Sequence, residues 1–241
     1  MTTYTRKEVT CANCGAQSSH ATLGSTNEFG SPDLDLRPPP MMRSTMRSWL
    51  QECSVCGFVA PRLDEETGDL RSLIASADYQ TALKDGATPP PAGRFVARAM
   101  IAAARNEPLS AFLQVLSAAW VADDAQLTEL ARSYRLKALE YWCGTPDAPP
   151  EENLRLLDVL RRAGRRETAE ALVARLLNEN MGGNLAKILA FQAALLSRHD
   201  ESCYKVSDVI SPTPPRPGRA AEAARPKAGL FSRLGHWISR R

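Results

Sequence analysis

The chain has 241 residues, of which 44% are hydrophobic and 24% charged, and its formal net charge is +3. These values are ordinary for a soluble globular protein, and no apolar run approaches the roughly 20 residues that a transmembrane helix needs, so such a helix is excluded. The charge is uneven, at +1 for residues 1–62, −4 for residues 63–210 and +6 for residues 211–241. A nucleic-acid-binding body would show a concentrated basic region, and these totals show none before residue 211.

Two copies of the pentapeptide Cys-x-x-Cys-Gly lie in the N-terminal quarter of the chain. Two intervening residues let both sulfurs of a pair face one ion, and the following glycine can take the left-handed conformation that turns backbone amides toward the sulfurs. Four thiolates fill the tetrahedral shell of zinc and leave no position for a catalytic water, so the pattern predicts a structural Zn²⁺. The expected ligands are Cys11, Cys14, Cys53 and Cys56.

Other uses of these cysteines stay open. Residues 1–10 are polar and lack the apolar run of a secretory signal, so we expect a reducing cytoplasm, where paired cysteines bind metal more often than they form disulfides. A rubredoxin-like iron site uses the same knuckles, but neither knuckle has a proline, and nearby aromatic cover is limited to Trp49 and Phe58. His20 could replace one ligand, although a lone loop histidine is more often solvated.

The cysteine-bearing segment is expected to form a zinc-ribbon-like head with a small sheet. Short extended pieces at Glu8–Thr10 and Trp49–Glu52 lead into the two knuckles. The polar stretch between them holds enough glycines and prolines to exclude a long helix. Asp33 and Asp35 invite a metal or acid–base interpretation, but such carboxylates more often cap turns or pair with a neighbouring cation, here Arg37.

Residues 41–50 place apolar side chains at near-helical spacing beside two arginines, which fits a short helix or an irregular strand. We favour a strand near Trp49. An aromatic and basic patch beside a zinc ribbon is how such modules hold nucleic acid, so Arg43, Arg47 and Trp49 are the candidate contacts of a nucleic-acid-binding regulator. Packing of Trp49 in the small core of the ribbon is the competing interpretation.

From about Leu70 the pattern becomes helical, because apolar residues recur at intervals of three and four. Prolines and glycines stand at the expected helix ends: Pro108 follows Glu107 at a start, and Gly144 follows Cys143 at an end. The connections are short, so consecutive helices should pack as antiparallel hairpins. The expected helices cover residues 92–105, 109–122, 125–143, 151–164, 167–179 and 184–199.

The stretch Leu156–Leu177 is typical of a tetratricopeptide-type helical hairpin, with a turn at Gly164. No regular 34-residue period extends through the region, so it is repeat-like rather than a repeat array, and an ordinary helical bundle is the alternative. The expected core residues are Leu113, Leu116, Trp120, Leu136, Leu139, Leu157, Leu160, Leu172, Leu176, Ile188 and Leu195.

The helical region offers no recognisable reaction centre. We expect Cys143 and Cys203 to be buried as small hydrophobic side chains. His199 lies near a predicted helix C-terminus, where a cation interacts favourably with the helix dipole. The motifs G-x-x-x-x-G-K-[ST], G-x-G-x-x-G, G-x-S-x-G and H-E-x-x-H do not occur, so we expect a protein that is not an enzyme.

The C-terminal residues differ in composition from the rest. Residues 211–227 contain five prolines with alanine and arginine and should form a disordered, semi-extended linker. In the basic tail, residues 228–241, five apolar residues occupy one third of a helix, so an amphipathic helix is expected to form on a surface. That surface is an anionic membrane or a protein. The predicted docking residues are Leu230, Phe231, Leu234, Trp237 and Ile238.

The segments CANCG, GSPDLDLRPP, QECSVCGFVA, SAAWVADD and LAFQAALL together resemble an uncharacterised bacterial family. Its members combine an N-terminal zinc-binding double knuckle with C-terminal helical hairpins, and the resemblance covers roughly residues 5–205. It implies a cytoplasmic protein that binds metal through the four knuckle cysteines, and it brings no established activity. Abundant alanine and the excess of arginine over lysine also suggest a bacterium with a GC-rich genome.

The predicted fold class is mainly α. The expected parts are a zinc-ribbon-like head (1–62), a helical hairpin domain (63–210), a disordered linker (211–227) and an amphipathic tail (228–241). We expect a non-enzymatic, zinc-binding adaptor that offers helical surfaces to a protein partner, in the cytoplasm or at the inner membrane face. A nucleic-acid-binding zinc-ribbon regulator is the alternative.

Overall fold

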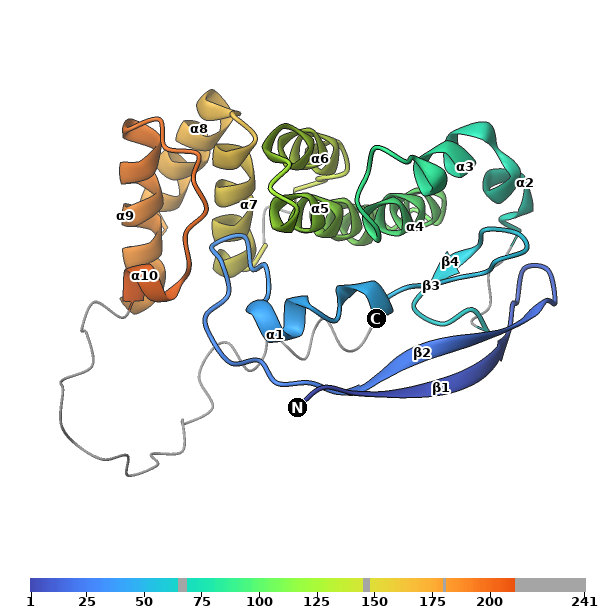
Figure 1. Cartoon of the computed structure of the whole chain (residues 1–241). Coiled ribbons are helices and arrows are strands. Elements are labelled where there is room, and N and C mark those ends of the chain that lie inside the picture. Colours follow the sequence, from blue (N-terminus) through green and yellow to red (C-terminus); the bar gives the residue numbers. More distant parts are fainter. Residues whose placement is uncertain (65–68, 145–147, 180, 211–241) are drawn as a thin grey trace, which may run out of the picture. The chain divides into compact units, whose positions relative to one another are not determined.

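The computed structural model describes residues 1–64, 69–144, 148–179 and 181–210, and Met1–Ile210 form one compact unit. This unit is mainly helical with a few strands, as predicted (Figure 1). None of its helices combines the length and apolar character that a membrane crossing requires. The predicted linker and tail, with Leu230, Phe231, Leu234, Trp237 and Ile238, lie outside the described residues.

The strands form two small antiparallel sheets. Strand β1 (Thr3–Thr10) pairs with β2 (Gln17–Ser25), and β3 (Gln51–Glu52) pairs with β4 (Val59–Ala60). The predicted extended pieces before each knuckle are therefore the end of β1 and β3. Strand β2 was not predicted, because its serine, threonine and histidine residues carry no alternation of apolar and polar side chains.

The stretch near Trp49 is not a strand, contrary to the prediction. It forms helix α1 (Pro40–Arg43) and the 3₁₀ helix η1 (Met46–Ser48). The side chain of Thr45 fixes this turn, because its hydroxyl donates to the carbonyl of Met42 and accepts the indole N–H of Trp49 at 2.8 Å. These side-chain hydrogen bonds compete with extended pairing, which begins only at β3.

The remaining helices are α2 (Arg71–Ala75), α3 (Ala77–Lys84), α4 (Ala92–Ala104), α5 (Pro108–Asp124), α6 (Thr128–Glu140), α7 (Pro150–Arg162), α8 (Arg166–Leu177), α9 (Gly183–Ser197) and α10 (Ser207–Ile210). Helices α4–α9 follow the predicted pattern, except that α6 ends at Glu140 rather than at Cys143, whereas α2, α3 and α10 were not among the predicted helices. Left-handed backbone at Asn106, Gln126, Gly164 and His199 follows the ends of four of these helices and starts a short connection after each.

Two hydrophobic cores hold these elements. The first joins the knuckles to α2–α6, since Cys53 and Phe58 of the head belong to the same cluster as Phe95 and Phe112. It crosses the predicted boundary between residues 62 and 63. The second lies among α7–α10 and includes Leu34. Among the expected core residues, Leu116, Trp120, Leu157, Leu160, Leu172, Leu176, Ile188 and Leu195 are buried, whereas Leu113, Leu136 and Leu139 are half-buried.

Cys143 and Cys203 are exposed, so the prediction that both are buried is wrong. Cys143 lies beyond the end of α6, and Cys203 lies in the segment after α9, where neither is on the apolar face of a helix. The thiol of Cys203 donates to Asp33 at 3.2 Å. His199 follows the end of α9 in a left-handed conformation and contacts Arg166.

Candidate metal centre

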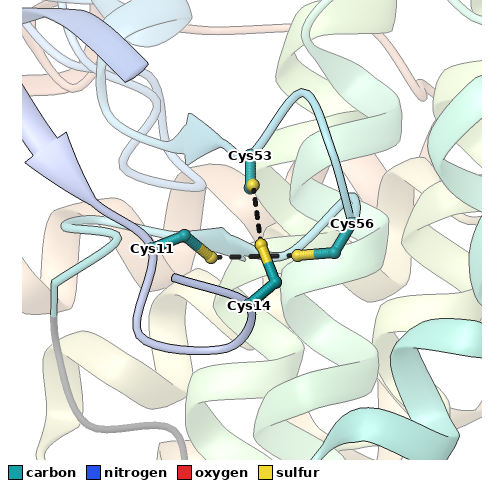
Figure 2. Close-up of side chains that lie close together, drawn as sticks. All are labelled: Cys11, Cys14, Cys53 and Cys56. Atoms are coloured by element: carbon teal, nitrogen blue, oxygen red, sulfur yellow. Dashed lines mark hydrogen bonds between the residues drawn. The ribbon is translucent and has the colours of Figure 1, made fainter. Parts of the chain in front are cut away.

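The four knuckle cysteines meet at one point, as predicted (Figure 2). Their sulfur atoms all lie within 4.8 Å of one another, with Cys11–Cys56 at 3.8 Å and Cys14–Cys53 at 3.6 Å. A tetrahedral zinc with Zn–S bonds of about 2.3 Å places its sulfurs about 3.8 Å apart. A disulfide would require about 2.05 Å, and all four cysteines are free. The spacing therefore fits a single metal ion.

Each knuckle has the same backbone turn. The amide of Gly15 donates to the carbonyl of Cys11 at 2.8 Å, and the amide of Gly57 donates to that of Cys53 at 2.8 Å. Both glycines have φ of +77°, the left-handed conformation that the Cys-x-x-Cys-Gly pattern predicts. This turn brings the two sulfurs of a knuckle to the same side.

The second knuckle is held against helix α3. The hydroxyl of Tyr79 donates to the carbonyl of Gly57 at 2.9 Å. A side chain at Gly57 would meet Gln80 at 3.0 Å and Leu83 at 3.1 Å, so the glycine is also needed for close packing. The first knuckle has a backbone bond to the chain after β4, where the amide of Ala12 donates to the carbonyl of Leu63 at 2.8 Å. The metal would therefore link the second knuckle, which is held against α3, to the first knuckle, which has fewer contacts that fix it.

The thiols differ in their proton affinity before a metal binds. Burial raises the pKa of Cys11 to about 12, against backbone hydrogen bonds that lower it. Burial also raises the pKa of Cys53, but hydrogen bonds from backbone amides and neighbouring thiols outweigh it and bring the pKa to about 7. A bound divalent cation would stabilise all four thiolates and release the remaining protons.

The centre is open on one side. Cys11 and Cys53 are each 1% exposed, Cys56 is half-buried and Cys14 is exposed. A depression of about 750 Å³ lies at this open side, and its lining includes Cys14, Cys56, Asn13 and Arg71. The side-chain amide of Asn13 donates to the sulfur of Cys56 at 3.3 Å.

His20 is not part of the metal group found among the described residues. It lies in β2, and its ring nitrogen is 2.8 Å from the hydroxyl of Ser18. Burial lowers the pKa of His20, and the charge of Arg94 adds to this effect. The centre is therefore formed by cysteines, as expected.

A buried ion-pair cluster, here called the Asp35 cluster, was not predicted. The carboxylate of Asp35 is fully buried, and its Oδ2 atom accepts from Trp120 at 3.0 Å, Arg135 at 3.0 Å and Arg162 at 3.2 Å. Asp123 accepts from the same two arginines at 2.6 and 2.9 Å. The cluster thus joins the polar stretch of the head to α5, α6 and α7.

The charged groups of the Asp35 cluster pair with one another. Burial raises the pKa of Asp35, but the charges of Arg135 and Arg162 outweigh it and hold the pKa far below its usual range. Asp33 pairs with Arg37, as the sequence indicated, and Asp158 pairs with Arg161 at 2.6 Å. The partners of Asp35 lie 85 to 127 residues away in sequence, so no local pattern could have revealed them.

The candidate nucleic-acid contacts do not form an open patch. The guanidinium of Arg43 pairs with Asp124 at 2.9 Å, and the ring of Trp49 packs edge-on against Phe95. Trp49 is half-buried beside the first core, in line with its packing role, whereas Arg47 is exposed. One of the three predicted residues therefore keeps an exposed side chain.

Comparison of the chain with protein-family models, curated proteins and solved structures finds no match. The structure shows two features of the family resemblance, the four-cysteine cluster and the mainly helical fold.

Proposed function

We propose that this chain is a non-enzymatic adaptor whose head, residues 1–62, is held in shape by a structural Zn²⁺. The convergence of four cysteine sulfurs at zinc-like spacing carries the proposal. Because four thiolates complete the tetrahedral shell, the ion would have no open position for a catalytic water. Iron can use the same donor set, but the lack of knuckle prolines and the sparse aromatic cover favour zinc.

The buried charged groups support a structural role. Asp33 and Asp158 pair with arginines three or four residues away, and Asp35 pairs with arginines of α6 and α7, so these carboxylates serve packing. Shifted pKa values often mark catalytic sites, but they also occur in structural ion-pair networks. The Asp35 cluster belongs to the second kind.

One face of the helical region is already covered and is not available to a partner. Residues 33–37 occupy the side of α5, α6 and α7 that carries Trp120, Arg135 and Arg162. A peptide held between helical hairpins would therefore bind elsewhere, at exposed parts of the hairpins formed by α7, α8 and α9 or at the head.

Partner capture is expected to depend on the metal. The full chain, loaded with zinc and immobilised, should retain a specific cytoplasmic protein that the Cys53→Ser variant loses, because the variant lacks a buried ligand. The exposed Cys143→Ser variant is the matched control and should capture the same protein. Equal capture by all three chains would separate partner binding from the metal centre and contradict the proposal.

Nucleic-acid binding is the alternative, and it rests on the exposed Arg47 together with the basic residues of the tail. If it were the function, fluorescence anisotropy with DNA or RNA would show an affinity that falls steeply with salt, since released counterions drive such binding. We expect no binding to either polymer at physiological salt. An Arg47→Ala variant should give the same anisotropy as the wild type. Salt-dependent binding weakened by Arg47→Ala would favour the regulator.

The tail is proposed to bind an anionic membrane face reversibly. The apolar residues of the tail stand beside basic residues such as Arg233 and Arg240, a combination that favours an anionic lipid surface. Full-length protein should therefore sediment with anionic vesicles at low salt and be released by high salt or by Trp237→Glu. Protein that stays in the supernatant with anionic vesicles would contradict membrane docking.

A further inference from the structure

We infer that the metal centre is an oxidant-sensitive switch, in which a peroxide attacks the sulfur of Cys14 and a Cys14–Cys53 disulfide replaces the bound zinc. This inference rests on the zinc of the proposed function, and it concerns how that zinc is released. It follows from the unequal exposure, hydrogen bonding and spacing of the four sulfurs.

Solvent exposure makes Cys14 the first sulfur that an oxidant would reach. Its side chain is exposed and lines the depression of about 750 Å³ beside the centre, whereas Cys11 and Cys53 are each 1% exposed. A small oxidant arriving from solvent therefore meets Cys14 first. A bound zinc would keep the sulfur as a thiolate, the form that reacts with peroxides.

Cys56 also lines the depression but is better protected. It is half-buried, and the amide of Asn13 donates a hydrogen bond to its sulfur at 3.3 Å. A hydrogen bond to a thiolate draws electron density from the sulfur and covers one direction of approach. Arg71 lines the same depression, and its positive charge reduces the electrostatic repulsion between the neighbouring thiolates.

Cys53 is the sulfur placed to complete the disulfide. Its Sγ lies 3.6 Å from Sγ of Cys14, so the two sulfurs are already in van der Waals contact. Bond formation requires the two sulfurs to approach to about 2.05 Å. The first knuckle can supply this movement, because the second is held by Tyr79 and by close packing of Gly57.

The reaction balances with hydrogen peroxide as the oxidant. The Cys14 thiolate attacks one peroxide oxygen, the O–O bond breaks, and a sulfenic acid and hydroxide form. The Cys53 thiolate then attacks the Cys14 sulfur, forming the S–S bond and expelling a second hydroxide. Two thiolates are oxidised by two electrons and one peroxide is reduced, and the two remaining sulfurs, Cys11 and Cys56, would no longer complete a zinc site.

Release of the metal would change the head more than the helices. Cys11 and Cys56 would lose their shared ion, while the Cys14–Cys53 disulfide would keep the first knuckle attached to the second in a changed geometry. A dithiol reductant would restore the four thiols and allow zinc to bind again. The switch is therefore reversible.

The test uses the zinc-loaded full chain with Cys143→Ser and Cys203→Ser, because both of those thiols are exposed and would consume peroxide. Hydrogen peroxide is added in steps, zinc release is followed with a chromogenic chelator, and quenched samples are mapped by mass spectrometry. We expect about one zinc released per peroxide consumed, a Cys14–Cys53 cross-linked peptide as the first product, and full recovery with dithiothreitol and zinc.

Each other outcome is decisive. A first product within one knuckle, or first modification at Cys11, Cys53 or Cys56, would overturn the inference while leaving the zinc site intact. Retention of zinc under excess peroxide would do the same. Absence of zinc before peroxide is added would instead overturn the proposed function. Asn13→Ala, which keeps all four ligands, should shift part of the first modification to Cys56, and an unchanged pattern would refute the protection described above.

Discussion

Loss of the metal is expected to disorder the head and lower the thermal stability of the chain strongly. Structural zinc contributes about 10 kcal/mol or more of binding free energy in small zinc domains, and that energy stabilises the folded state directly. Here Cys11 and Cys53 are themselves members of the first hydrophobic core, beside Phe58 and Phe95. Chelation or Cys53→Ser should therefore loosen the knuckles together with α2 and α3.

The second core should survive this treatment. Helices α7, α8 and α9 pack around their own apolar cluster, and only α2 and α3 are expected to loosen with the knuckles, so most of the helical circular dichroism should remain after chelation. Hydrogen exchange would then show fast exchange in β3, β4 and α3 and slow exchange in α7. Cys143→Ser, whose side chain is exposed, should behave as the wild type. Global unfolding on chelation would show instead that the two cores form one cooperative unit.

Neutralising Asp35 is expected to produce the largest loss of stability outside the knuckles. Asp35→Asn keeps the size of the side chain but removes the charge that faces Arg135 and Arg162, and breaking a buried ion pair typically costs about 3–5 kcal/mol. Thermal or urea denaturation of the full chain would measure the loss. The matched control is Asp64→Asn at the exposed pair with Arg62, which should change little.

The effect of Asp35 should also depend on pH in a defined direction. Its pKa in the folded chain lies well below the value of about 3.9 in an unfolded chain. The stability it contributes is therefore fully present above pH 4 and is lost as the pH falls toward the folded pKa. The difference in the free energy of unfolding between the wild type and Asp35→Asn should become smaller below about pH 4. A constant difference from pH 6 to pH 3 would show that Asp35 acts by packing rather than by charge.

The metal centre and the helices could be predicted because their signals are local. Two Cys-x-x-Cys-Gly pentapeptides specify both the ligands and the turns, and Gly15 and Gly57 have the backbone conformation that the pattern requires. Helices α4–α9 follow from apolar residues three and four apart with short connections. Strand β2 lacks such a signal, because its side chains are mostly small and polar.

The role of residues 31–37 depends on contacts that sequence cannot show. The amide of Leu34 donates to the carbonyl of Tyr204, the amide of Val206 donates to that of Pro32, and Asp35 lies among side chains of three helices. The Asp33–Arg37 pair spans four residues and is visible in the sequence, whereas these partners are distant along the chain. The segment connects the head to both cores, which a polar, proline-rich sequence does not suggest.

The most direct test of the account is zinc K-edge X-ray absorption on the purified full chain. We predict one zinc per chain, with four sulfur neighbours at about 2.3 Å and no nitrogen or oxygen in the first shell. A spectrum without zinc, or one that requires a nitrogen or oxygen ligand in place of a cysteine sulfur, would contradict the structural four-cysteine centre.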